Sequence, residues 1–275
     1  LSHKGNFGHL LLIAGSADKP GAALMAAEAA LRAGVGLLTL ASHPVAAIAA
    51  VGRAPEAMTA QYSTPAELRD MLPELIKGKT ALAVGPGWGC EAEKYEILLQ
   101  LCRDFEGALL LDADALTLIS GRERRPWIER AEAGKTTIIT PHPGEAARLL
   151  EVKHAGIVED RAWAVRELAF RFGAVAVLKG AATLVCRDGM VFVNPSGNPG
   201  MACGGSGDVL TGIAGAFAAC GGDALDYMIR AVYLHGLAGD MAAAAKGQGG
   251  MKATDLIQFV PDILREWEEG RAVYD

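Results

Sequence analysis

The chain has 275 residues, of which 51% are hydrophobic and 21% are charged, and its formal net charge is −6. This length allows burial of about 70–75% of the unfolded surface, which is enough for one large domain. The modest negative charge argues against a nucleic-acid partner, and no apolar run approaches the roughly 20 residues that cross a bilayer.

Strand-like and helix-like patterns alternate along most of the chain. Residues 9–15 form an apolar run typical of a strand, and residues 21–34 form an alanine-rich helical pattern that ends in glycine. Five further strand-like runs lie at 36–42, 80–85, 107–114, 136–145 and 174–180. Helical patterns lie between them, for example at 66–77, 93–105 and 159–172. Because most strand runs are apolar throughout, we expect strands that are covered on both faces.

The last third of the chain follows a different pattern. Residues 183–194 predict a hairpin, because the Asp-Gly turn at 188–189 separates two β-rich runs. After residue 204 the sequence is helical in character to its end. Alternating strands and helices predict right-handed crossovers in a largely parallel sheet, and no linker or repeat interrupts them. We therefore predict one α/β domain over residues 1–275.

The five cysteines are odd in number and form no CxxC pair. They indicate reduced thiols in a cytoplasmic protein rather than a disulfide framework. Cys203 lies beside a glycine cluster, but no basic residue nearby would activate its thiol, so we interpret it as a small packing residue. No charged segment followed by an apolar stretch begins the chain, and we expect no export signal.

Polar or glycine-rich clusters follow several of the predicted strands. They lie at 15–21, 85–89, 112–114, 142–145 and 179–180. Because ligands of a parallel sheet bind at the carboxyl ends of its strands, these clusters should converge on one edge. Their convergence predicts a ligand site there.

Three glycine motifs imitate nucleotide-binding sequences. The Gly-Lys-Thr runs at 78–80 and 134–136 lack the earlier glycine of a P-loop and precede a strand instead of following one, so we interpret them as turns. The run VGPGWGCE at 84–91 has G-x-G-x-G spacing rather than the dinucleotide pattern. It predicts either a tight strand-to-helix turn or a backbone wall against a ligand.

The run GGSGD at 204–208 precedes a helical pattern. Its amides lack intrahelical partners, and its glycines let the backbone approach an anion closely. Asp208 would repel a bound phosphate, but it is suited to take a proton from a hydroxyl that attacks phosphorus. The alternative is that Asp208 caps the helix.

Four segments resemble signature sequences of the ADP-dependent NAD(P)H-hydrate dehydratases, a branch of the ribokinase-like superfamily. They are HKGNFGHLLLIAGS (3–16), TPHPGEAARLL (140–150), VAVLKGAATLV (175–185) and GNPGMACGGSGDVLTGI (197–213). The resemblance extends in family order from about Ser2 to Asp255. It implies a ribokinase-like three-layer sandwich with a largely parallel central sheet and helices on both faces.

The resemblance also implies an activity, the repair of a damaged cofactor. The family phosphorylates the C6 hydroxyl of hydrated NADH or NADPH (the S epimer) with ADP, or with ATP in eukaryotic members, and then eliminates phosphate. Phosphate leaves readily from this position, whereas hydroxide does not. Mg²⁺ is the implied cofactor, an NAD(P)H-hydrate epimerase is the implied functional partner or fused domain, and the implied assembly is a homo-oligomer, a tetramer. The first residue, Leu1, is compatible with excision from such a fusion or with trimming of a standalone protein.

Roles for individual residues follow from the same resemblance. Asp208 would be the base, and an anion hole would be formed by the amides of Gly204, Gly205, Ser206 and Gly207. The nucleotide would bind at Lys179, Gly180, Ala181, Ala182, Thr183 and Gly207. The hydrated dinucleotide would contact Ala22, Gly87, His142 and Asp208. Glu145 would hold Mg²⁺ through water, although His142 stands where related sugar kinases have asparagine.

Simpler interpretations stay open for several of these residues. Lys179 could be a solvated lysine at a strand end, and His235 a satisfied histidine of the core. Asp112 and Asp114 either support the site or cap the helix that follows them.

Two other functions also stay open. One is a kinase of a small vitamin-type alcohol on the same fold, which would release a stable phosphorylated alcohol. The other is a non-catalytic nucleotide-binding module, against which Asp208 argues, because a sensor needs no base. The sequence leaves open whether ADP or ATP is the donor and which hydrate is preferred.

Overall fold

A computed structural model describes residues 7–270 of the chain. Among these residues, nine strands form a single sheet. In chain order they are β1 (His9–Ile13), β2 (Leu37–Ser42), β3 (Met58–Gln61), β4 (Ala81–Val84), β5 (Ala108–Leu111), β6 (Thr137–Ile139), β7 (Val175–Leu178), β8 (Leu184–Arg187) and β9 (Met190–Val193). Their spatial order is β3-β2-β1-β4-β5-β6-β7-β8-β9. The pairs from β3 to β7 are parallel, and β8 and β9 add an antiparallel hairpin.

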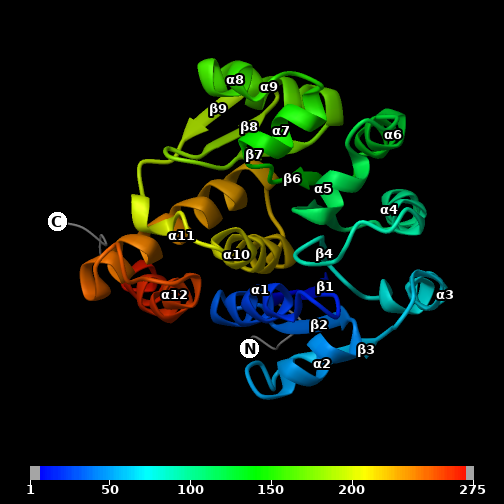
Figure 1. Ribbon diagram of the computed structural model, residues 1–275, viewed down its shortest axis with the longest axis horizontal. Coiled ribbons are helices and arrows are strands. Elements are labelled where there is room, and N and C mark those ends of the chain that lie inside the picture. Colours follow the sequence, from blue (N-terminus) through cyan, green and yellow to red (C-terminus); the bar gives the residue numbers. More distant parts are fainter. Residues whose placement is uncertain (1–6, 271–275) are drawn as a thin grey trace.

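Helices cover both faces of the sheet, as Figure 1 shows. On one face pack α1 (Pro20–Arg32), α2 (Pro44–Val51), α10 (Ser206–Cys220), α11 (Ala224–Lys246) and α12 (Ala253–Glu268). On the other face pack α3 (Pro65–Leu75), α4 (Glu93–Asp104), α5 (Asp114–Ile119), α6 (Arg125–Glu132), α7 (Pro143–Leu150), α8 (His154–Glu159) and α9 (Arg161–Phe172). A short 3-10 helix, η2 (Pro199–Met201), precedes α10. None of these helices is long and apolar enough to cross a membrane.

Two hydrophobic cores fill the space between the layers. In β1, Leu10 and Leu12 belong to the core beneath α1 and α10, whereas Leu11 and Ile13 belong to the core beneath α3–α9. Successive side chains of a strand point to opposite faces, so an entirely apolar strand is buried on both sides. The three-layer sandwich predicted from the sequence is confirmed.

The close packing of α10 on α1 sets where the first turn of α10 lies. A Cβ atom on Gly212 would lie only 2.1 Å from the carbonyl oxygen of Ala26. Glycine at this position therefore lets the two helices approach closely. The start of α10 is held at the carboxyl edge of the sheet as a result.

The predicted elements match the structure with three corrections. The strand predicted at 136–145 is only Thr137–Ile139, because Pro143 instead begins α7. The sequence also missed β3 and several short helices on the α3–α9 face. The Gly-Lys-Thr runs do form turns before β4 and β6, and the hairpin turns at 188–189. In the signature segment 3–16, residues 3–6 lie outside the described residues.

Candidate active site

The five polar clusters lie where the sequence predicts them, at the carboxyl edge of the sheet. Residues 15–21 follow β1, 85–89 follow β4, 112–114 follow β5, 142–145 follow β6 and 179–180 follow β7. These five strands are neighbours in the sheet and parallel to one another. Their following segments therefore form one continuous edge.

A buried ion pair lies at the centre of this edge. Lys179 Nζ lies 2.6 Å from Asp112 Oδ1, and the hydroxyl of Thr211 on α10 donates to Asp112 Oδ2 over 2.7 Å. Asp112 is 1% exposed and the Lys179 side chain 17% exposed, so Lys179 is not a solvated strand-end lysine. Burial opposes the charge on Lys179, but the carboxylates of Asp112 and Glu145 outweigh it and raise the lysine pKa.

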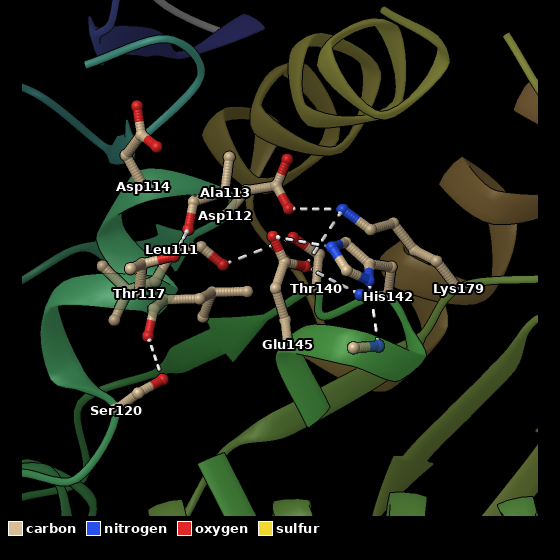
Figure 2. Close-up of polar contacts among 12 residues, drawn as sticks. Leu111, Asp112, Ala113, Asp114, Thr117, Ser120, Thr140, His142, Glu145 and Lys179 are labelled. Carbon is tan, nitrogen blue, oxygen red and sulfur yellow. Dashed lines mark hydrogen bonds and ion pairs between the residues drawn. The ribbon is translucent and has the colours of Figure 1, made fainter. Parts of the chain in front are cut away.

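Glu145 and His142 lie beside this pair and fix each other (Figure 2). Glu145 Oε2 accepts from the His142 backbone N–H over 2.8 Å, and His142 Nδ1 accepts from the Gly144 N–H over 3.0 Å, which makes a capping box for α7. Glu145 Oε2 also lies 3.9 Å from Lys179 Nζ. Burial, together with Asp112, raises the pKa of Glu145, and burial followed by Lys179 lowers the pKa of His142. His142 is therefore neutral at pH 7.

Asp208 lies in the first turn of α10 and is half-buried. The helix cap is Gly205 rather than Asp208, and α10 has no side-chain cap hydrogen bond, so Asp208 does not cap the helix. Its carboxylate makes no hydrogen bond or ion pair within residues 7–270. Burial, and then the charge of Asp112, raises the pKa of Asp208 to about 7, although Lys179 opposes them. A carboxyl with this pKa can accept a proton near neutral pH.

The 179–183 segment is held in a fixed conformation after β7. The guanidinium of Arg161 donates to the carbonyl oxygens of Leu178 and Ala181, and the Thr183 hydroxyl donates to the Gly180 carbonyl over 2.9 Å. Gly180 and Ala182 have positive φ angles of 136° and 50°. The backbone of this segment is therefore shaped before any ligand arrives.

A cavity of about 770 Å³ opens beside this segment. All six residues predicted to bind nucleotide line it: Lys179, Gly180, Ala181, Ala182, Thr183 and Gly207. Ser206 and His142 line it as well, whereas Gly204 and Gly205 lie in the turn that leads into α10. A second cavity of about 550 Å³ lies at the opposite edge of the sheet, against the turn at 134–136.

Two of the predicted contacts of the hydrated dinucleotide, Ala22 and Gly87, lie outside the lining of the cavity of about 770 Å³, whereas His142 belongs to it. Ala22 on α1 lies against Gly87, since a Cβ on Gly87 would be 2.9 Å from the Ala22 Cβ. Asp114 joins this group: its Oδ2 accepts from the Gly89 N–H over 2.7 Å and lies 3.4 Å from Lys19 Nζ. In Figure 2 the Asp114 side chain points away from Asp112 and Lys179. Asp112 and Asp114 thus support different parts of the site.

His235 is a satisfied histidine, as the sequence suggests, and it also lines the cavity. Its Nε2 lies 2.9 Å from the Ser206 carbonyl oxygen. Burial lowers its pKa to about 4, so the ring is neutral and Nε2 donates the bond. The histidine thereby ties α11 to the start of α10.

Two parts of the site were missed by the sequence analysis. The loop at 193–202 forms one wall of the cavity. Its asparagines, prolines and glycines are a turn signal, but they do not reveal what the turn faces. Thr211 was also missed, because a threonine inside an apolar helix gives no sign of its partner.

Residues 7–270 contain no group of three or more His, Cys, Asp or Glu side chains placed to hold a metal ion. A single carboxylate such as Glu145 still fits a metal that keeps most of its own waters, as Mg²⁺ does.

The chain is similar to known proteins over nearly its whole length. The family model of the NAD(P)H-hydrate dehydratases matches residues 10–262. A bifunctional NAD(P)H-hydrate repair enzyme of Moorella thermoacetica is 41% identical over 97% of this chain and 51% of its own length. The counterpart in Escherichia coli is 38% identical over 96% of this chain and 48% of its own length. The chain therefore spans about half the length of these curated relatives.

Solved structures show the same fold. The ADP/ATP-dependent NAD(P)H-hydrate dehydratase of Bacillus subtilis, co-crystallised with ATP and Mg²⁺, is 30% identical, covers 97% of this chain and 92% of its own, and has a TM-score of 0.83. A ribokinase of Arabidopsis thaliana is 10% identical, covers 92% of this chain and 98% of its own, and has a TM-score of 0.54. The second likeness concerns the fold alone.

Proposed function

Because the chain belongs to the NAD(P)H-hydrate dehydratase family, we propose that it converts hydrated NADH or NADPH back to NAD(P)H with ADP or ATP as phosphoryl donor. The main support for this proposal is Asp208. It is a half-buried carboxylate without a protein partner among the described residues, its pKa is raised to about 7, and it lies next to the cavity-lining Gly207.

Each side of the site suits one reactant. The nucleotide fits the cavity over β7 and β8, with its phosphates toward Lys179 and the amides of the Gly204–Gly207 anion hole. The hydrated dinucleotide fits the edge over β1 and β4, against Ala22 and Gly87, and from there would extend toward His142 after β6. Asp208, on α10, is near enough to Asp112 after β5 and Lys179 after β7 for both charges to affect its pKa, and it would lie between the two reactants.

Asp208 would take the proton of the C6 hydroxyl as its oxygen attacks the terminal phosphorus of the nucleotide. A new O–P bond forms, and the bond to the leaving nucleotide breaks. The phosphate on C6 then leaves with its bonding electrons while the ring nitrogen donates electrons to C6, and loss of a proton from C5 to solvent gives the C5=C6 double bond of NAD(P)H. Phosphate is a good leaving group and hydroxide is a poor one, so phosphoryl transfer makes the elimination possible.

Glu145 would hold Mg²⁺ through water. Asp112, Glu145 and Asp208 place three carboxyl groups around the single ammonium of Lys179. This excess of acidic groups disfavours a nucleotide polyanion that arrives without a cation. When bound, Mg²⁺ supplies charge neutralisation for the transferred phosphoryl group.

Further features of the proposal concern the whole protein. We propose that residues 1–275 form one dehydratase domain and that an NAD(P)H-hydrate epimerase is its functional partner or fused neighbour, which agrees with relatives named as bifunctional and about twice as long. The five unpaired cysteines support a cytoplasmic location. A homotetramer is the assembly that the family resemblance implies.

The products test the function. The protein is mixed with Mg²⁺, ADP and hydrated NADH, and the ultraviolet absorbance of reduced nicotinamide is followed together with phosphate release. Equal amounts of NADH and phosphate are expected. A stable phosphorylated alcohol would instead indicate an ordinary kinase, and nucleotide binding without turnover a non-catalytic module.

A further inference from the structure

The loop at 194–201 is fastened along one face of α11. The Ser196 hydroxyl lies 3.1 Å from the Tyr233 carbonyl oxygen, and a Cβ on Gly236 would come within 2.1 Å of that hydroxyl. One turn further, a Cβ on Gly239 would come within 2.2 Å of Met201 Sδ. The positions 233, 236 and 239–240 recur at helical spacing and share one face. The two glycines let the loop lie directly on the helix.

Asp240 ends this face and holds the loop by both carboxylate oxygens. Its Oδ2 accepts from the Gly197 N–H over 2.8 Å, and its Oδ1 accepts from Asn198 Nδ2 over 2.9 Å. Asn198 Oδ1 in turn accepts from the Gly200 N–H over 3.0 Å, at the start of η2. One side chain of α11 therefore orders the loop from Gly197 to Gly200.

The direction of each hydrogen bond between Asp240 and the loop is fixed. Gly197 and Gly200 offer backbone N–H donors, so each needs an acceptor. Asn198 must present its oxygen to Gly200 and its NH₂ to residue 240, which must then accept twice. An amide at position 240 would place a donor against a donor, and rotating either amide only moves the conflict to another bond.

Resting on the proposed function, we propose that Asp240 is a positioning residue for the nucleotide. The loop that it fastens lines the same cavity as the 179–183 segment, and Gly197 and Asn198 themselves belong to that lining. Asp240 is absent from that lining and acts only through the loop. When the carboxylate is lost, the loop can separate the two opposed donors by moving away from α11. Nucleotide binding must then return the loop to α11, which lowers the affinity.

A single variant and a double variant that exchanges the carboxylate and the amide of this contact test the proposal directly. Asp240→Asn should weaken ADP binding roughly 2- to 12-fold, which corresponds to about 0.5–1.5 kcal/mol for the loss of one partly exposed hydrogen bond. The double variant Asp240→Asn with Asn198→Asp supplies acceptors and donors in the right order again, and it should restore most of the lost affinity. In Asp240→Asn, whose side chain lies outside the cavity lining, the KM for the hydrate and the kcat at saturating nucleotide should change little. The matched control is Asp226→Asn on the same helix, an exposed residue paired with Arg230.

Calorimetric titration with ADP measures each affinity, and thermal unfolding is recorded in parallel. Unchanged ADP affinity in Asp240→Asn, or a double variant as weak as the single one, would overturn the inference. An equal loss in the Asp226→Asn control would also overturn it, because the effect would then be one of general stability. Wild-type protein that binds no ADP would overturn the proposed function itself, which separates the two failures.

Discussion

Replacing Asp208 by asparagine removes the proposed base and keeps the size of the side chain. General base catalysis contributes about 10²–10⁴-fold to the rate, which corresponds to roughly 3–5.5 kcal/mol of transition-state stabilisation. We expect kcat of Asp208→Asn to fall within this range. ADP affinity should stay the same or rise, because one negative charge beside the phosphates is lost. In wild type, kcat/KM should fall about tenfold per pH unit below pH 7, as a base with a pKa of about 7 becomes protonated.

The same substitution should stabilise the fold at neutral pH. Burial and Asp112 raise the pKa of Asp208 from its ordinary 3.8 to about 7, so ionising the folded protein is costly. A shift of this size corresponds to up to about 4 kcal/mol at pH above 7. The unfolded chain ionises near pH 4 and the folded protein only near pH 7, so wild type loses this stability as pH rises between them. Asparagine does not titrate, and the variant should gain in melting temperature relative to wild type over that interval.

Three measurements on one variant therefore decide the role of Asp208. They are kcat with hydrated NADH, ADP affinity by calorimetry, and melting temperature at pH 5 and pH 8. Asp226→Asn is the control, since its carboxylate is on the surface of α11. A variant with more than about a tenth of wild-type kcat would refute the base assignment. A lower melting temperature for Asp208→Asn than for wild type at pH 8 would refute the proposed cost of ionising Asp208 in the folded protein.

Three further predictions concern the surroundings of Asp208. Ala22→Trp fills the space beside α1 and should raise KM for the hydrate far more than KM for ADP. If both KM values stay as in wild type, the dinucleotide binds elsewhere. Asp112→Asn removes a charge that raises the pKa of Asp208, so the acidic limb of the pH–rate profile should move to lower pH, and an unmoved limb would contradict that influence. A crystal soaked with ADP should show the nucleotide near Thr183 and Gly207, and density at either Gly-Lys-Thr turn instead would contradict the proposed site.

Much of the fold could be predicted because buried parallel strands have uninterrupted apolar sequences. The missed strand β3 is the informative exception. Its sequence, Met-Thr-Ala-Gln, lies at the edge of the sheet and is largely exposed, so no apolar run marks it. The short helices α5 and α8 have six residues each and are ordered mainly by packing, which no local pattern reveals.

The candidate site could be predicted where its residues follow strands or belong to a recognisable motif. Lys179 and His142 follow strands that topology brings to one edge, and Asp208 belongs to the GGSGD run at 204–208. Thr211 and Asp240 lie inside helices, and their partners are 99 and 42 or 43 residues away along the chain. Such contacts depend on how α10 and α11 pack, which hydrophobic periodicity does not specify. Sequence reasoning thus identified the candidate edge and left out Thr211 and Asp240, which hold parts of it in place.

Burial of Asp208, together with the charge of Asp112, explains how the proposed base keeps a raised pKa at the start of a helix next to a lysine. The positive end of the α10 dipole and the ammonium of Lys179 would both favour an ionised, weakly basic Asp208. Asp112 counters this in two ways: it binds the ammonium at 2.6 Å, and its own negative charge acts on Asp208. The Thr211 hydroxyl holds the second oxygen of Asp112 and so fixes the orientation of this carboxylate. Lys179 therefore stays beside Gly207, where phosphate would bind, while burial and Asp112 outweigh its effect on the pKa of the proposed base.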